Sequence, residues 1–198
     1  MSGYNILDYG FDAQGVQLYV LALDVDGAAP ISHIYTYRPQ TQTMTGINDL
    51  IDQLVGRVYI SGDTIYAIGT NYLTTFKSLK QSQKRLVYGW SVADLHAGDP
   101  PVFVYAPSSE MGGALSSVRV ISASGNEIKL NLPSGVSSVL DSGKKIYCFA
   151  SDRIFVYTVE GKYQRMHPLP FEIDSVSKAV EGFAFLTSGG VVYLLPLP

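Results

Sequence analysis

The sequence predicts an all-β fold built from short antiparallel strands. Residues that favour strands are abundant, with 14 Tyr and 8 Phe among 198 residues, and 19 Gly provide positions for tight turns. Short apolar runs alternate with dipeptides that contain Gly, Asp or Ser, which is typical of strands joined by tight turns. Runs of three such strands recur along the chain.

The first apolar run, "QLYVLALDVDGAAP" at residues 17–30, ends in Asp24-Val25-Asp26-Gly27. Asp-Gly is a strong hairpin signal, so we predict a turn between two strands. The motif also resembles that of the haloacid-dehalogenase-like phosphohydrolases. In those enzymes the first Asp attacks phosphorus, and both Asp residues help to hold Mg²⁺. The resemblance ends at Ala28, and helical periodicity is nearly absent after residue 56. A Mg-dependent phosphohydrolase using Asp24 and Asp26 is therefore our third alternative for function.

One segment has the apolar spacing of a helix. In "TGINDLIDQLVG", Ile47, Leu50, Ile51 and Leu54 fall at i, i+3, i+4 and i+7, and Gly56 follows at the expected stop. We predict a helix here and strands elsewhere, about fourteen or fifteen in all by this pattern.

The rest of the chain reads as three-strand meanders. Residues 57–76 contain strands separated by turns at Gly62-Asp63 and at residues 69–71, and residues 145–165 contain turns at Ser151-Asp152 and Glu160-Gly161. The same rhythm returns at residues 182–195, and in weaker form at residues 85–107 and 117–133.

These meanders resemble β-propeller blades of the WD-repeat or quinoprotein kind. The resemblance rests on "VYISGDTIYAIGTNYLTTF" and "IYCFASDRIFVYTVEGKY". At about 45 residues per blade it implies a small propeller of four or five blades. We expect a single all-β domain over residues 1–198, with a β-sandwich or barrel as the alternative architecture.

The two ends of the chain suggest how a propeller would close. "YNILDYG" at residues 4–10 reads as a strand, and "VVYLLPLP" at residues 191–198 is almost entirely apolar. We predict that residues 190–195 form a buried strand, in a blade that the N-terminal segment helps to complete. Pro196 and Pro198 would then stop further pairing at the edge.

No catalytic, cofactor or metal site emerges from the residue pattern. His33, His96 and His167 lie far apart, without the close pairing of zinc ligands. We expect His33 on the solvent face of a strand and His167 in a loop. Cys148 is the only cysteine, which excludes an internal disulfide, and its strand-like setting predicts a buried small hydrophobe.

Charge and composition favour a protein-binding role. The net charge is −3 without any run of Lys or Arg, which argues against nucleic acid as a partner. No apolar stretch is long enough for a bilayer-spanning helix, and the first residues do not read as a secretory signal, so we expect an intracellular or virion protein. The hypothesis is a non-enzymatic scaffold for protein partners, with self-association included. The alternative is a structural or assembly protein of a particle such as a virion.

Overall fold

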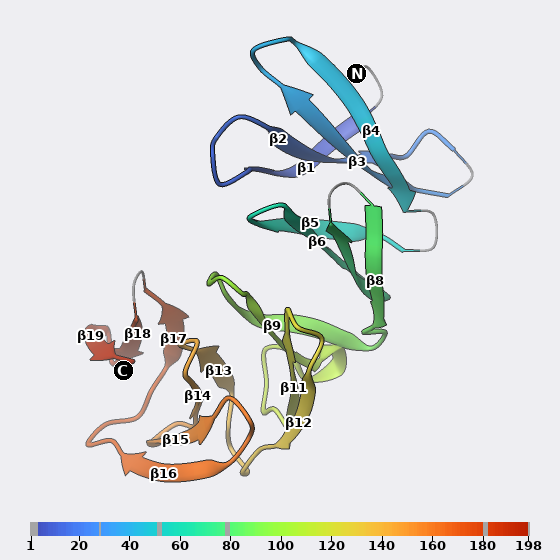
Figure 1. The fold of residues 1–198 in the computed structure, drawn as a ribbon. Coiled ribbons are helices and arrows are strands. Elements are labelled where there is room, and N and C mark those ends of the chain that lie inside the picture. The colour runs from blue at the N-terminus through green and yellow to red at the C-terminus, as the bar shows by residue number, and fades with distance from the viewer. Residues whose placement is uncertain (1–3, 28, 51–52, 78–79, 180–181, 198) are drawn as a thin grey trace. The chain divides into compact units, whose positions relative to one another are not determined.

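The computed structural model describes residues 4–27, 29–50, 53–77, 80–179 and 182–197 (Figure 1). Two compact units make up the chain, residues 1–89 and residues 90–198, and each is described by itself. Within the described residues, the helical structure is a single 3-10 turn, η1 (Ser108–Glu110), and the remaining regular elements are strands. The prediction of an all-β chain is confirmed.

The first unit contains two four-stranded antiparallel sheets, each a meander in chain order. Sheet 1 consists of β1 (Tyr4–Phe11), β2 (Leu18–Asp24), β3 (Ile31–Arg38) and β4 (Thr43–Leu50). Sheet 2 consists of β5 (Val55–Ser61), β6 (Thr64–Gly69), β7 (Tyr72–Lys77) and β8 (Lys80–Leu86). The two sheets share one core, in which Leu21 and Ile34 of sheet 1 pack with Ile65 and Phe76 of sheet 2.

The second unit contains three further meanders. Sheet 3 consists of β9 (Trp90–His96), β10 (Val102–Pro107), β11 (Ser117–Ser122) and β12 (Glu127–Asn131). Sheet 4 consists of β13 (Ser138–Asp141), β14 (Lys145–Phe149), β15 (Arg153–Thr158) and β16 (Tyr163–Pro168). Sheet 5 has three strands, β17 (Ser175–Lys178), β18 (Phe183–Ser188) and β19 (Val191–Pro196). One apolar cluster joins sheets 3 and 4, and another joins sheets 4 and 5.

The predicted turns lie where the sequence placed them. Gly62-Asp63 joins β5 to β6, with Gly62 at a φ of 58°, a backbone conformation that glycine adopts without steric cost. Glu160-Gly161 lies between β15 and β16, and Gly189-Gly190 joins β18 to β19. The five sheets of the described residues agree with the predicted four or five blades, although the nineteen strands found there exceed the number expected. The prediction of one domain remains a prediction.

The same local device links neighbouring sheets in both units. The first strand of sheet 1 has a bulge at Leu7, and the following Asp8 accepts a hydrogen bond from the backbone N–H of Val58 in sheet 2, at 2.9 Å. The first strand of sheet 3 has the corresponding bulge at Ala93, and the following Asp94 accepts from the backbone N–H of Asp141 in sheet 4, at 2.7 Å. A bulge redirects the next side chain. The carboxylate thereby satisfies a backbone donor of the adjacent sheet.

The predicted helix at residues 45–56 is wrong. The segment forms β4, which pairs with β3 from Thr43 to Leu50, and β5 begins at Val55. A bulge explains the misleading pattern, because Asn48 pairs with Ile34 and Gly46 pairs with Tyr35, so that Ile47 is the extra residue. An extra residue shifts the two-residue alternation by one, and the apolar spacing then resembles that of a helix. Ile51 lies outside the described residues.

The predicted closure is wrong in two respects. Residues 191–196 do form a strand, but β19 is exposed along most of its length, with Val192 60% and Leu194 57% exposed. The N-terminal strand β1 pairs with β2 in sheet 1, whereas β19 pairs with β18. Sheet 5 thus contains no N-terminal strand among the residues that the structure describes. Pro198 lies outside them.

Candidate functional site

Sheet 5 ends in an open edge. Sheets 1 to 4 each have a fourth strand outside the third, but within the described residues β19 is the last strand of sheet 5 and pairs only with β18. The backbone groups along the other side of β19 therefore have no ladder partner in the described part of the chain. An unpaired edge of this kind is a template for another strand.

The composition of β19 distinguishes it from the other outer strands. Its sequence is VVYLLP, without a charged residue. The outer strand of sheet 2, β8, is by contrast KQSQKRL and mostly exposed. Lysines on an edge strand discourage pairing with other chains, and β8 has this protection. β19 has no lysine, and its one proline, Pro196, is its last residue, so the exposed apolar residues before Pro196 mark a contact surface.

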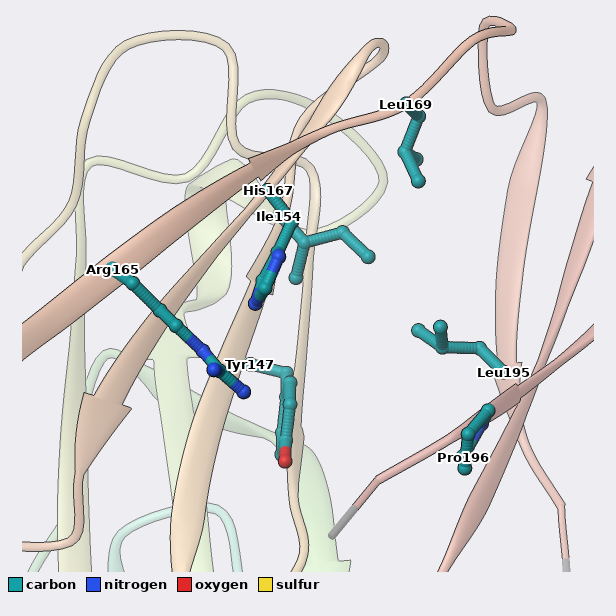
Figure 2. A pocket seen from close by; sticks show the side chains of 7 residues that line it. All are labelled: Tyr147, Ile154, Arg165, His167, Leu169, Leu195 and Pro196. Carbon is teal, nitrogen blue, oxygen red and sulfur yellow. The ribbon is translucent and has the colours of Figure 1, made fainter.

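A groove of about 260 Å³ lies beside this edge, between sheets 4 and 5. Figure 2 shows the side chains of Arg165 and His167, both from β16, across the groove from Leu195 and Pro196 of β19. The complete lining is Tyr147, Ile154, Arg165, His167, Leu169, Leu195 and Pro196. The groove is therefore mainly apolar, with its cationic group on the side of sheet 4.

The strand register decides which β19 side chains face the groove. Leu186 and Ala184 of β18 are buried against sheet 4. Tyr193 pairs with Leu186, and Leu195 pairs with Ala184. Tyr193 also stacks on Phe171, with ring centroids 4.2 Å apart and planes inclined by 13°. Because directly paired residues share a face, Tyr193 and Leu195 point towards sheet 4. A fourth strand paired to β19 would send every second side chain in the same direction.

Arg165 supplies the positive charge of the groove. Its side chain is exposed, and no carboxylate among the described residues lies within 4.0 Å of it to form an ion pair. Burial raises the pKa of the Tyr147 hydroxyl, while a hydrogen bond with Ser142 and the charge of Arg165 act in the opposite direction. Tyr147 therefore remains neutral at physiological pH. The groove can offer an anionic group the guanidinium of Arg165.

A second polar cluster joins the first strands of sheets 3, 4 and 5. Asp94 accepts hydrogen bonds from the backbone N–H of Asp141 and from Nζ of Lys178, at 2.7 and 2.6 Å. Asp141 is fully buried, and its Oδ2 has no hydrogen-bond partner among the described residues. Burial raises the pKa of Asp141, against the opposing effects of the Gly143 N–H, His96 and Lys178. We interpret this cluster as a structural junction between three sheets.

Asp24 and Asp26 form the predicted turn. Asp24 pairs with Ile31 at the end of the β2–β3 ladder, and its Oδ1 accepts from the backbone N–H of Asp26 at 3.0 Å. A side chain that binds the backbone two residues later is a usual turn device of Asp. The described residues contain no group of three His, Cys, Asp or Glu that could hold a metal ion. Nothing in this geometry favours the phosphohydrolase alternative.

The three histidines lie in three different sheets. His33 is half-buried in β3 and stacks on Tyr35, so its expected place on the solvent face holds only in part. His167 lies in β16 and not in a loop, because Ile154 pairs with it. Cys148 is fully buried, as predicted, and burial raises the pKa of its thiol to about 12. Such a thiol is unreactive at neutral pH.

Sequence reasoning missed the groove because its residues come from β14, β15, β16 and β19, which are distant in the chain. One signal was available. The tail "VVYLLPLP" is apolar and has no charged residue, which does indicate a contact surface. The sequence alone does not distinguish such a surface from a strand that is buried within its own chain.

Comparison with known proteins shows the fold. No family model matches the chain, and no curated protein matches its sequence. Solved structures do match. An oligogalacturonate lyase in complex with manganese has a TM-score of 0.61 at 13% identity, over 100% of this chain and 67% of the lyase chain.

Two further structures are similar over 98% of this chain. The Pan2 WD40 domain of Neurospora crassa has a TM-score of 0.56 at 9% identity, and BBS1N in complex with ARL6DN has a TM-score of 0.55 at 15% identity. The chain spans 63% of the length of each of these two chains. At such identities the likeness concerns the fold alone. The chain has an all-β fold of β-propeller type, as its meanders predicted.

Proposed function

We propose that this chain is a non-enzymatic scaffold module that binds protein partners by accepting an extended segment as the fourth strand of sheet 5. The observation that supports this proposal is the open, apolar and uncharged edge of β19, beside a preformed groove. In this mode of recognition, main-chain hydrogen bonds supply affinity and pockets for alternate side chains supply specificity.

Sheet 4 provides a comparison for such a complex. In sheet 4, the third strand β15 is covered by β16 and has several buried residues, among them Ile154 and Val156. β19 occupies the third position of sheet 5 and has a similar apolar composition, but most of its residues are exposed. A bound strand would bury apolar area worth about 25 cal/mol per Å². It would also satisfy the free backbone groups of the edge.

Protein binding agrees with the fold comparison. BBS1N was solved in complex with ARL6DN, so a protein of this fold does bind a protein partner, although a fold by itself does not determine function. Similarity to the oligogalacturonate lyase does not by itself indicate catalysis, because at 13% identity it concerns the fold alone. The described part of this chain has no cluster of residues suited to a metal ion.

Self-association is the second candidate, and one observation favours it. The face of sheet 5 turned away from sheet 4 presents two exposed phenylalanines, Phe183 and Phe185, and next to them Val192 and Leu194. A contiguous exposed apolar surface of this kind marks a site of association. A second copy could cover it, as an assembly protein of a particle would require.

The test is a peptide selection against the full chain. A displayed library of random eight-residue peptides is selected, and hydrogen exchange of the chain is measured with and without each enriched peptide. We expect slower amide exchange in residues 191–195, and at least a tenfold loss of affinity when Val192 and Leu194 are both replaced by Lys.

The matched control replaces Leu86, an exposed leucine on the edge strand β8, by Lys, and should leave affinity unchanged. If no peptide is enriched, or if protection appears away from β19, the proposal is wrong. Light scattering over a concentration series separates the second candidate, because the double Lys variant should then dissociate oligomers that the wild-type chain forms.

A further inference from the structure

We infer that the segment accepted by sheet 5 is an acidic–apolar strand, with apolar side chains at alternate positions and a carboxylate placed to pair with Arg165. This inference rests on the proposed function and names the chemistry of the partner. Three features of the groove support it: its position, its volume and its charge.

The first feature is position. In sheet 4, β16 lies outside β15 as the fourth strand, and it provides Arg165 and His167 to the groove. In sheet 5 the corresponding fourth strand is missing from the described residues, and Leu195 and Pro196 of β19 line the opposite side of the groove. A strand paired to β19 would lie about 4.8 Å from it. Its inward side chains would enter the groove between β19 and β16.

The second feature is volume. The groove holds about 260 Å³, and an apolar cavity of about 150 Å³ is enough for a benzene-sized group. One large apolar side chain therefore fits, with room for a second, smaller group beside it. Tyr147, Ile154, Leu169 and Leu195 provide the apolar contacts for such a side chain.

The third feature is charge. Arg165 is the only Lys or Arg in the lining, which contains no Asp or Glu. A guanidinium forms two parallel hydrogen bonds with a carboxylate, a geometry that neutral groups cannot reproduce. An inward acidic residue would thus find a partner at Arg165, whereas an inward lysine would face a like charge without compensation.

The net charge of the whole chain, by contrast, opposes acidic ligands in general. The net charge is −3, so long-range attraction does not favour an acidic segment. Selectivity for a carboxylate must then arise locally at Arg165, and this makes the inference separable from a general charge effect.

The experiment uses synthetic eight-residue peptides of alternating Val and Thr, with a single Glu, Gln or Lys moved through every position. Binding to the full chain is measured by calorimetry, and the site by hydrogen exchange at residues 191–195. At one position we expect the Glu peptide to bind about tenfold more tightly than the Gln peptide, and the Lys peptide more weakly than both.

Charge exchange at the groove provides the decisive comparison. In Arg165→Glu the preference should reverse, so that the Lys peptide binds more tightly than the Glu peptide. Lys162→Glu makes the same change in net charge at an exposed residue outside the groove lining, and it should preserve the wild-type order.

The outcomes separate the two proposals. If Glu, Gln and Lys peptides bind equally and protect residues 191–195, or if both variants weaken the Glu peptide to the same extent, then the acidic chemistry is wrong and strand addition remains. If none of the peptides binds, and the random library also yields no peptide that protects β19, then strand addition itself is wrong.

Discussion

Replacing Phe149 by Ala is expected to lower the free energy of unfolding of the second unit by about 3–5 kcal/mol. Phe149 is fully buried in β14, within the cluster that joins sheets 4 and 5. The truncation removes apolar contacts and leaves a cavity that the two sheets cannot close without moving. The measurement is urea unfolding followed by the fluorescence of Trp90, the single tryptophan, which lies in the second unit.

The control for this variant is Phe185→Ala in sheet 5. Phe185 is 42% exposed, on the face of the sheet turned away from sheet 4, so its truncation should cost at most about 1 kcal/mol. A loss as large as that of Phe149 would contradict the exposure of this face and indicate that it is covered in solution. Unfolding would then be compared in dilute and concentrated samples. A loss of stability that depends on concentration would indicate that a second copy covers this face, and a loss independent of concentration would indicate that the same chain covers it.

Replacing Asp94 by Ala is expected to cost about 3 kcal/mol, also measured through Trp90. The substitution removes the acceptor of two hydrogen bonds, one from the backbone of Asp141 and one from Lys178. It leaves a buried N–H without its partner and a partly buried ammonium without its counter-charge. Asp152→Ala is the control, because the Asp152 side chain is about half exposed and its ion pair with Arg153 lies at the surface. Equal losses in the two variants would contradict the junction.

The same cluster predicts a pH dependence. Burial raises the pKa of Asp141, so the folded state holds a proton more tightly than the unfolded state does. Protonated Asp141 therefore stabilises the folded state. This contribution is fully present below the pKa of Asp in the unfolded chain, about 3.9, and is lost as pH rises through the raised pKa of Asp141 in the folded chain. Asp141→Asn should remove this dependence and be more stable than wild type at pH 7, since the Asn oxygen can still accept from Gly143.

Parallel unfolding series from pH 3 to pH 8 test this expectation. The difference in stability between Asp141→Asn and wild type should grow in favour of the variant as pH rises. A difference independent of pH would show that Asp141 has the same pKa in both states.

The local sequence determined the meanders and their turns. Gly62-Asp63 and Glu160-Gly161 lie where the pattern placed them, because a short turn between two strands depends on residues close in sequence. The Asp24–Gly27 turn and the burial of Cys148 were also readable, since each follows from the type of residue and its immediate neighbours. These interactions need no information from distant parts of the chain.

Only the tertiary structure decided the features that depend on pairing between distant residues. The bulge at Ile47 made a strand resemble a helix, because the ladder with β3 overrides local periodicity. The exposure of β19 depends on whether a fourth strand covers it. An apolar tail has the same sequence pattern whether it packs within its own chain or against a partner, so the sequence cannot distinguish the two cases. The groove around Arg165 arose from four strands that no spacing in the sequence connects. Short-range backbone chemistry therefore specified the strands, whereas long-range sheet packing specified the surface available for binding.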